Sequence, residues 1–236
     1  MDLNTNEWGE PGGPRVLLLH GLQSASGTWY RIAEGLAAAG AHAIAPDLRG
    51  HGRSPRGERY ALGDFVSDLE PGWDLVVGHS LGAVIAAHAR QADPAFASAA
   101  VLIDPPFEIP EEQFEAVLAE QLAEQRATKY DVQAANPRWS DEDVLLKVEA
   151  SRRCEPAVIE AVLRDNRPWA YAGLLDGLDV LLIGGHPDRG GLFDPKTAPE
   201  RSVLVEHAGH SVHRDCPGRV LDLILEELHA GAGREG

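Results

Sequence analysis

The sequence predicts an α/β fold in which a mostly parallel, twisted sheet carries helices on both faces. Short apolar runs typical of buried strands alternate along most of the chain with segments of helical pattern. The length of 236 residues is common for one α/β domain, and the hydrophobic fraction of 44% is ordinary for a globular protein. These observations together favour a single α/β domain as the core.

The N-terminal part of the chain is expected to supply the first strands of this sheet. Residues 15–19 form a buried apolar run, and the Pro- and Gly-rich turn at residues 11–14 stops any helix before it. Ahead of that turn there is room for a short edge strand around residues 3–8. Residues 43–45 are the next expected strand.

The most specific motif is the pentapeptide Gly-His-Ser-Leu-Gly at residues 78–82. The apolar run at residues 73–77 predicts a buried strand before it, and residues 83–89 predict a helix after it. A serine on so sharp a turn has a strained backbone and an exposed hydroxyl. The flanking glycines are required because side chains there would collide with the neighbouring strand and helix. This setting predicts that Ser80 is a nucleophile.

An oxyanion hole is expected beside Ser80. An oxyanion forms when a serine attacks a carbonyl, and two backbone N–H donors must be held ready for it. One donor is the N–H of Leu81, at the positive end of a helix dipole. The other is expected in the loop after the first buried strand, from the N–H of Leu22, with Gly21 allowing the loop to pass close to the substrate.

The sequence contains ten histidines, and their positions along the chain indicate which one is the base that takes the Ser80 proton. Residues 203–205 predict a late strand, and residues 220–225 predict a terminal amphipathic helix. A histidine on the loop between them reaches back over the sheet edge to the serine. His210 is the predicted base because Gly209 before it gives the sharp turn that a loop base needs, while His207 and His213 are interpreted as ordinary loop histidines. The sequence contains no H-E-x-x-H motif and no Cys/His cluster, so no metal site is expected.

Charge and cysteine content exclude several classes of function. The formal net charge of −16 argues against nucleic-acid binding and disfavours anionic membranes and strongly anionic substrates. Cys154 and Cys216 are isolated and are expected to be free thiols. The sequence shows neither a leader-like start nor an apolar stretch long enough to cross a bilayer, so we expect a cytoplasmic protein.

These motifs together resemble those of the α/β-hydrolases. The resemblance is carried by His-Gly at 20–21, Asp-Leu-Arg-Gly-His-Gly-Arg-Ser at 47–54, the pentapeptide at 78–82, and Ala-Gly-His at 208–210. They span nearly the whole chain and occur in the family's order. The resemblance implies that residues 47–54 form a structural turn, and that serine, acid and histidine follow one another along the chain.

The resemblance leaves two candidates for the acid that orients His210. Most α/β-hydrolases place it on the loop after a late strand, here residues 180–183, which corresponds to Asp188. A minority place it at the end of the strand that follows the elbow helix, which corresponds to Asp104. His186 stands where close relatives often carry an acid, and this departure weakens Asp188. The two are nearly balanced, with a slight preference for Asp104.

Strand–helix alternation stops between Asp104 and residue 178. Residues 111–130, a segment that starts after Ser140, and residues 156–163 have helical patterns instead. The resemblance implies that this all-helical insert is a cap over the active site. We expect a core of residues 1–104 and 174–236 and a cap of residues 105–173. Aromatic side chains give the expected pocket an apolar character, with walls that include Trp29, Trp139 and Trp169.

The predicted function is hydrolysis of a small or medium apolar carboxylic ester or lactone through an acyl-enzyme on Ser80. No cofactor or metal is expected, and the chain is expected to act as a monomer or homodimer without nucleic-acid or membrane partners. Two kinds of alternative stay open. The same triad serves C–C bond hydrolysis and cofactor-free perhydrolysis, and some proteins of this fold are ligand-binding receptors with little turnover.

Overall fold

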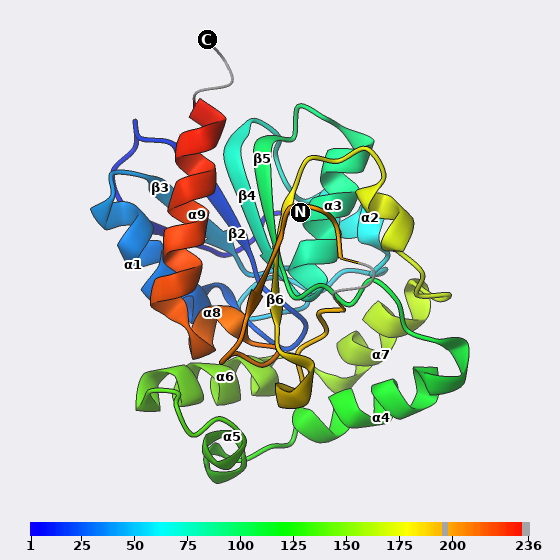
Figure 1. Ribbon diagram of the computed structural model, residues 1–236. Helices are drawn as coiled ribbons and strands as arrows, with labels where there is room; N and C mark the ends of the chain where they lie inside the picture. The colour runs from blue at the N-terminus through cyan, green and yellow to red at the C-terminus, as the bar shows by residue number, and fades with distance from the viewer. Residues whose placement is uncertain (195–197, 233–236) are drawn as a thin grey trace.

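The computed structural model describes residues 1–194 and 198–232. Its described strands form one sheet in the order β1-β3-β2-β4-β5-β6-β7 (Figure 1). They are β1 (Thr5–Trp8), β2 (Arg15–Leu19), β3 (His42–Pro46), β4 (Trp73–His79), β5 (Ala97–Ile103), β6 (Leu181–Gly185) and β7 (Ser202–Val205). β1 pairs with β3 in antiparallel register, and the other pairs are parallel. The mostly parallel sheet and the short edge strand are therefore confirmed.

Both faces of the sheet are apolar. Successive residues of a strand point to opposite faces, and in β2 Leu17 and Leu19 join one core cluster while Val16 and Leu18 join the other. Burial on both faces explains why these strands appear in the sequence as continuous apolar runs.

Helices cover the two faces as expected. α1 (Tyr30–Ala38) and α9 (Pro217–Ala232) pack against each other over one face, and α2 (Leu62–Val66) and α3 (Leu81–Ala92) cover the other (Figure 1). Helix α9 contains the amphipathic segment predicted at residues 220–225 and is longer than that segment at both ends. The short helix α8 (Val212–Asp215) precedes it. The short 3-10 helices are η1 (Ser26–Trp29), η2 (Glu111–Gln113), η3 (Ala172–Leu175) and η4 (Pro187–Arg189).

The segment between β5 and β6 is helical and lies beyond the carboxyl ends of the strands (Figure 1). It contains α4 (Phe114–Glu124), α5 (Lys129–Ala135), α6 (Asp141–Arg153) and α7 (Pro156–Asp165). Ser140 caps α6 as predicted, because its Oγ accepts a 3.0 Å hydrogen bond from the N–H of Asp143. These helices fall within residues 105–173, and the division of the chain into a core and a cap stays a prediction.

One predicted helix is two helices in the structure. The sequence predicts a single helix over residues 111–130, but α4 ends at Glu124 and α5 begins at Lys129. Thr128 and Asp131 form a capping box, in which the Thr128 N–H donates to the Asp131 carboxylate at 2.8 Å. Such a box satisfies free N–H groups at the start of a new helix, which is why α5 is separate.

The two ends of the helical insert pair with each other. The Ile109 N–H donates to the Trp169 carbonyl at 2.9 Å, and the Tyr171 N–H donates to the Phe107 carbonyl at 2.6 Å. Glu108 and Ala170 form an antiparallel bridge between these bonds. The insert therefore leaves and rejoins the sheet through one closed stem.

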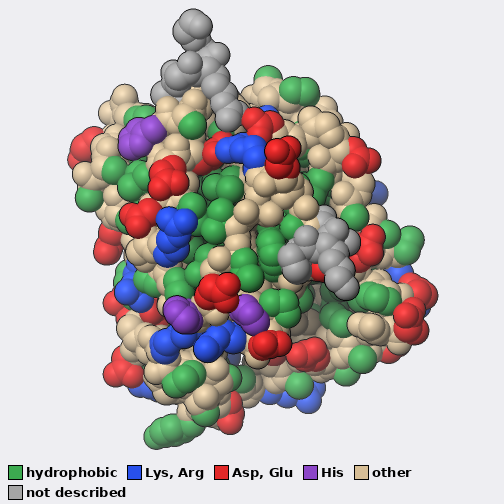
Figure 2. Space-filling model, viewed as in Figure 1, with side chains coloured by type: hydrophobic (Ala, Val, Ile, Leu, Met, Phe, Trp, Pro, Cys, Tyr) green, Lys and Arg blue, Asp and Glu red, His purple; other side chains and the backbone are tan. Residues whose placement is uncertain are grey.

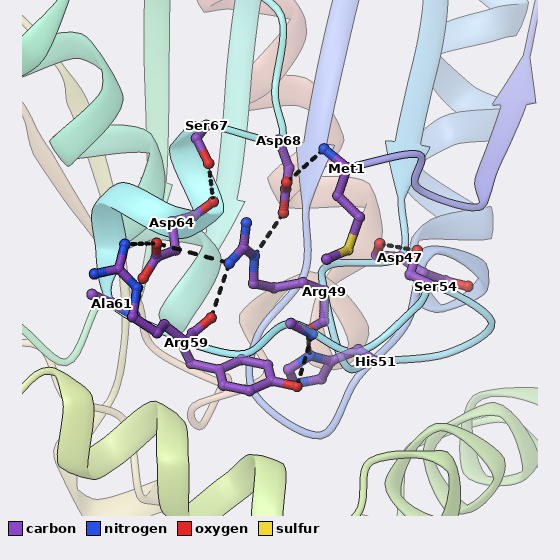
Figure 3. A network of polar contacts seen from close by, with 12 residues as sticks. Met1, Asp47, Arg49, His51, Ser54, Arg59, Ala61, Asp64, Ser67 and Asp68 are labelled. Atoms are coloured by element: carbon purple, nitrogen blue, oxygen red, sulfur yellow. Dashed lines mark hydrogen bonds and ion pairs between the residues drawn. The ribbon is translucent and has the colours of Figure 1, made fainter.

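Residues 47–54 form the hydrogen-bonded turn that the resemblance implies. The Asp47 carboxylate accepts hydrogen bonds from Ser26 at 2.7 Å and from the Arg53 N–H at 2.9 Å. Arg49 in the same turn donates to Asp68 at 2.7 Å and to the Arg59 carbonyl at 2.9 Å (Figure 3). This network fixes the loop that leads from β3 toward α2.

Candidate active site

Ser80 lies at the predicted elbow between β4 and α3. Its φ of 52° and ψ of −119° are strained for a residue with a side chain. A Cβ on Gly78 would lie 2.3 Å from the Gly82 carbonyl oxygen, and one on Gly82 would lie 2.2 Å from the Leu19 carbonyl oxygen. The turn can therefore form only with glycine at both positions.

The loop after β2 packs directly against Ser80. A Cβ on Gly21 would lie 3.0 Å from the Ser80 Cβ, so a larger residue here would have to displace its neighbours by a few tenths of an ångström. Leu22, on this loop, and Leu81, the first residue of α3, line the same cavity as Ser80. The two residues predicted to supply oxyanion donors therefore line one cavity with Ser80 and come from separate elements.

His210 pairs with Asp104 across 106 residues of sequence. The His210 Nδ1 lies 2.7 Å from the Asp104 Oδ2. Asp104 is buried, with a positive φ of 45° at the end of β5. Its oxygens also accept backbone N–H bonds, from Gly185 at 2.9 Å and from Leu192 at 2.9 and 3.1 Å. This carboxylate is held rigidly in the orientation that fixes the histidine ring.

Asp188, the second candidate acid, lies outside this arrangement. Its side chain is 91% exposed, and its Oδ2 lies 3.8 Å from the Nδ1 of His186. Of the two candidate acids, the structure brings only Asp104 into hydrogen-bond contact with His210.

Two further histidines support the loop of His210. The Nε2 of His79 donates to the His210 carbonyl at 2.9 Å, and its ring lies 4.9 Å from that of His210 and 4.5 Å from that of His213. Burial, with the nearby histidines adding to it, lowers the pKa of His79 well below 6.5; burial and the charge of Arg214 do the same for the pKa of His213. Both rings are neutral at neutral pH.

Two sequence interpretations are corrected here. His213 is not on an open loop but is buried in α8, where it packs on Trp29 with ring centroids 4.5 Å apart. Trp29 is fully buried in the core cluster between the sheet, α1 and α9 and lies outside the cavity lining. It lies at the end of η1 with its ring in the core, where it packs against His213.

The cavity above Ser80 has a volume of about 1490 Å³ and is lined by both the sheet edge and the helical insert. Trp139 and Trp169 line it, as predicted for the pocket walls. Other apolar lining residues include Phe107, Ile109, Val117, Val162, Leu163 and Phe193. The interior is mainly apolar, and acidic side chains dominate its charged lining.

An ion pair within the cavity lining was not foreseen. Lys147 of α6 lies 2.7 Å from Glu124 of α4, and both residues line the cavity. Although burial opposes ionisation, the charge and hydrogen bond of Lys147 hold the pKa of Glu124 below its ordinary value. The partners lie on different helices, so no local sequence spacing could reveal the pair.

The described part of the chain holds neither a cluster of metal-ligating side chains nor a disulfide. Residues 1–194 and 198–232 contain no group of three or more His, Cys, Asp or Glu side chains placed to hold a metal ion. Cys154 and Cys216 are free, and burial raises the pKa of the Cys154 thiol to about 12. Every helix within these ranges is too short or too polar to span a bilayer.

Comparison with known proteins identifies relatives with hydrolase names. The chain is 34% identical over 158 residues to Lipase LipV of Mycobacterium tuberculosis, a match that covers 61% of this chain and 58% of the lipase. It is 29% identical over 256 aligned positions to Esterase Rv0045c of the same organism, covering 92% of this chain and 83% of that esterase. The chain thus matches less than two thirds of the lipase's length.

A solved structure supports the fold over the whole chain. The crystal structure of E-2-(acetamidomethylene)succinate hydrolase matches with a TM-score of 0.80 and 23% identity, covering 96% of this chain and 95% of that one. At this identity the match bears on the fold alone. Residues 16–223, from β2 into α9, match the Alpha/beta hydrolase family. The chain therefore belongs to the α/β hydrolase family, as its motifs indicated.

Proposed function

We propose that this enzyme hydrolyses a small or medium carboxylic ester or lactone through an acyl-enzyme on Ser80. The observation that carries the proposal is the 2.7 Å contact between His210 and buried Asp104, beneath a cavity that Ser80 also lines. The names of two relatives, a lipase and an esterase, support ester hydrolysis.

The proposed mechanism assigns one role to each group. His210 takes the Ser80 proton through Nε2 as the hydroxyl oxygen attacks the carbonyl carbon. Asp104 keeps the Nδ1 proton in place and stabilises the histidine cation. The N–H groups of Leu22 and Leu81 hold the oxyanion, and the intermediate collapses as His210 protonates the leaving alkoxide. His210 then activates water, which releases the acid and restores Ser80.

The cavity supports an apolar substrate without a strong negative charge. Its inner wall carries Leu22, Phe107, Trp139 and Trp169, whereas its charged lining is mainly acidic. On the face seen in Figure 2, hydrophobic side chains gather in the middle, and acidic, basic and histidine side chains surround them. With a net charge of −16, this surface disfavours the approach of anionic substrates.

Labelling with a fluorophosphonate tests the nucleophile. We expect one adduct, mapped by peptide mass spectrometry to Ser80, and we expect Ser80→Ala and His210→Ala to lose both the adduct and ester turnover. Ser67→Ala is the matched control, since it removes a serine whose hydroxyl bonds only locally to the Asp64 carbonyl. A label on another serine, or full turnover by Ser80→Ala, contradicts the proposal.

A substrate panel then separates ester from lactone and C–C bond chemistry. The panel contains p-nitrophenyl esters with acyl chains of two to eight carbons, γ- and δ-lactones and a vinylogous diketone. These substrates offer the same triad different bonds to cleave. We expect turnover of neutral esters or lactones. Cleavage of the diketone alone supports the C–C hydrolase alternative, and a stoichiometric label with no turnover of any substrate supports the receptor alternative.

A further inference from the structure

The side chain of Asp215 joins the helical insert to the loop of the proposed base. The Asp215 Oδ1 accepts a 2.8 Å hydrogen bond from the indole N–H of Trp139, and its Oδ2 accepts a 2.7 Å bond from the backbone N–H of Gly209. Gly209 directly precedes His210. One side chain in α8 therefore joins a residue of the helical insert to the neighbour of the base.

Trp139 is fixed within the insert. It is 6% exposed and packs with Val132, Val144 and Val148 in a small hydrophobic cluster of the insert itself. It also directly precedes Ser140, the N-cap of α6. A movement of α5 and α6 must therefore move the Trp139 ring with it.

The same contact is reinforced from both sides. The Arg214 guanidinium carbon lies 4.9 Å above the Trp139 ring, and Arg138 donates to the His207 carbonyl while lying 4.0 Å from Asp215. Arg214 also donates to the Ser24 hydroxyl, on the loop that follows Gly21, at 3.0 Å. The insert therefore contacts the loop of His210 beside two mostly buried charged groups, the Arg214 guanidinium and the Asp215 carboxylate.

Trp139 and Asp215 also line the cavity together with Gly209 and His210. A molecule that fills the cavity would contact Trp139, and the Asp215 carboxylate connects this residue to Gly209. Hydrogen bonds to an ionised acceptor are stronger and more directional than neutral ones, which suits the carboxylate to this task.

We propose that Trp139 and Asp215 are positioning residues, which couple the placement of the cap to the placement of His210. The proposal rests on the proposed function, because it takes His210 as the base. The insert then contributes to the chemical step, by positioning His210, as well as to substrate selection.

Two near-isosteric variants break the link. Trp139→Phe keeps an aromatic ring and removes the indole donor, and Asp215→Asn keeps the volume and offers one acceptor oxygen for two donors. Trp73→Phe is the matched control for Trp139→Phe, because the Trp73 indole N–H donates a hydrogen bond too, to the Glu70 backbone carbonyl, and the side chain is similarly buried but lies at the opposite end of the sheet. Asp74→Asn is the control for Asp215→Asn, because the Asp74 carboxylate accepts a hydrogen bond from the Arg15 N–H at the same distant end of the sheet.

We expect each link variant to lower kcat for a p-nitrophenyl ester by about ten- to a hundredfold, the cost typical of a slightly misplaced catalytic group. The KM for a short ester should change less than about threefold, since both replacements nearly keep the size of the side chains that line the cavity. The kcat of the double variant should lie within about twofold of the kcat of the less active single variant, because both changes break the same connection. The Trp73→Phe and Asp74→Asn controls should keep the wild-type kcat.

Hydrogen exchange at the Gly209 amide gives a readout that needs no turnover. In both link variants this amide should exchange faster than in wild type and in the two controls, with the thermal unfolding midpoint largely retained. Additive losses in the double variant, or a Trp139→Phe enzyme that matches wild type in kcat and in Gly209 exchange, overturn the coupling. If Asp215→Asn fails to fold, the Trp139→Phe results decide alone. If Ser80→Ala keeps its turnover, the proposed function fails, and the Gly209 exchange still decides whether the link exists.

Discussion

Replacement of Asp104 by asparagine tests which carboxylate acts on His210. Asp104 is buried, and its two oxygens accept bonds from His210, Gly185 and Leu192 at 2.7 to 3.1 Å. Asparagine has nearly the same volume and keeps one acceptor oxygen, but it places N–H donors where the other oxygen stood.

The size of the effect follows from this geometry. If the amide oxygen stays on the Gly185 N–H, the amide nitrogen faces the Nδ1 of His210, which must then accept a hydrogen bond. The ring proton moves to Nε2, and a protonated Nε2 cannot take the proton of Ser80. The corresponding replacement in serine proteases lowers kcat about 10⁴-fold, or about 5.5 kcal/mol of transition-state stabilisation. We expect a loss of that order here.

The assay compares kcat/KM for a short p-nitrophenyl ester in wild type, Asp104→Asn and Asp188→Asn. Asp188 is 91% exposed, so its replacement should stay within about twofold of wild type. Urea unfolding serves as the control, since the Leu192 N–H loses part of its acceptor and stability should fall by about 1–3 kcal/mol. A loss below tenfold in Asp104→Asn, with a large loss in Asp188→Asn, refutes the assignment of the acid.

Three further predictions concern the fold. Gly82→Ala should abolish fluorophosphonate labelling and lower the thermal midpoint, because the new Cβ would lie 2.2 Å from the Leu19 carbonyl oxygen; a labelled, fully stable variant contradicts this. Phe114→Ala should lower the free energy of unfolding by about 3–5 kcal/mol in urea titrations, because this 1% exposed ring joins the insert to the core cluster; a change below 1 kcal/mol argues against that packing. Stability should also fall as the pH drops from 6.5 toward 3, because burial lowers the pKa of His51 to about 3, so that only the unfolded state binds this proton within that window. The slope from His51 approaches about 1.4 kcal/mol per pH unit, and His51→Asn, which retains a donor for the Arg49 carbonyl, should reduce it; an unchanged slope counts against His51.

The sequence was most informative where the structure is local. The elbow at Ser80 needs a strand, a turn and a helix in direct succession, so the glycine spacing and the flanking apolar runs were enough to predict it. The same holds for the Ser140 cap of α6, whose partner Asp143 is three residues away. Sequence reasoning missed the end of α4 because the Thr128–Asp131 capping box lies inside a segment of continuous helical pattern.

Contacts between distant segments set the limit of sequence reasoning. Asp104 and Asp188 both follow the carboxyl ends of neighbouring strands, and the direction of each side chain depends on a backbone turn that composition does not reveal. The positive φ of Asp104 directs its carboxylate under His210, whereas Asp188 lies in η4 and faces solvent. The prediction for Trp29 was wrong for a similar reason, since an aromatic residue that follows the loop after β2 suits a pocket wall as well as a core.

The paired stem of the insert makes this enzyme suitable for recombination of its parts. Phe107 and Tyr171 are joined by a backbone hydrogen bond, so a segment exchanged between them leaves every strand pair of the sheet intact. Libraries of chimaeras could therefore vary all four α-helices of the insert in one step. A donor segment without an aromatic N–H at the place of Trp139 would leave the Asp215 carboxylate with one partner fewer, and such chimaeras should lose rate as well as change their substrate range.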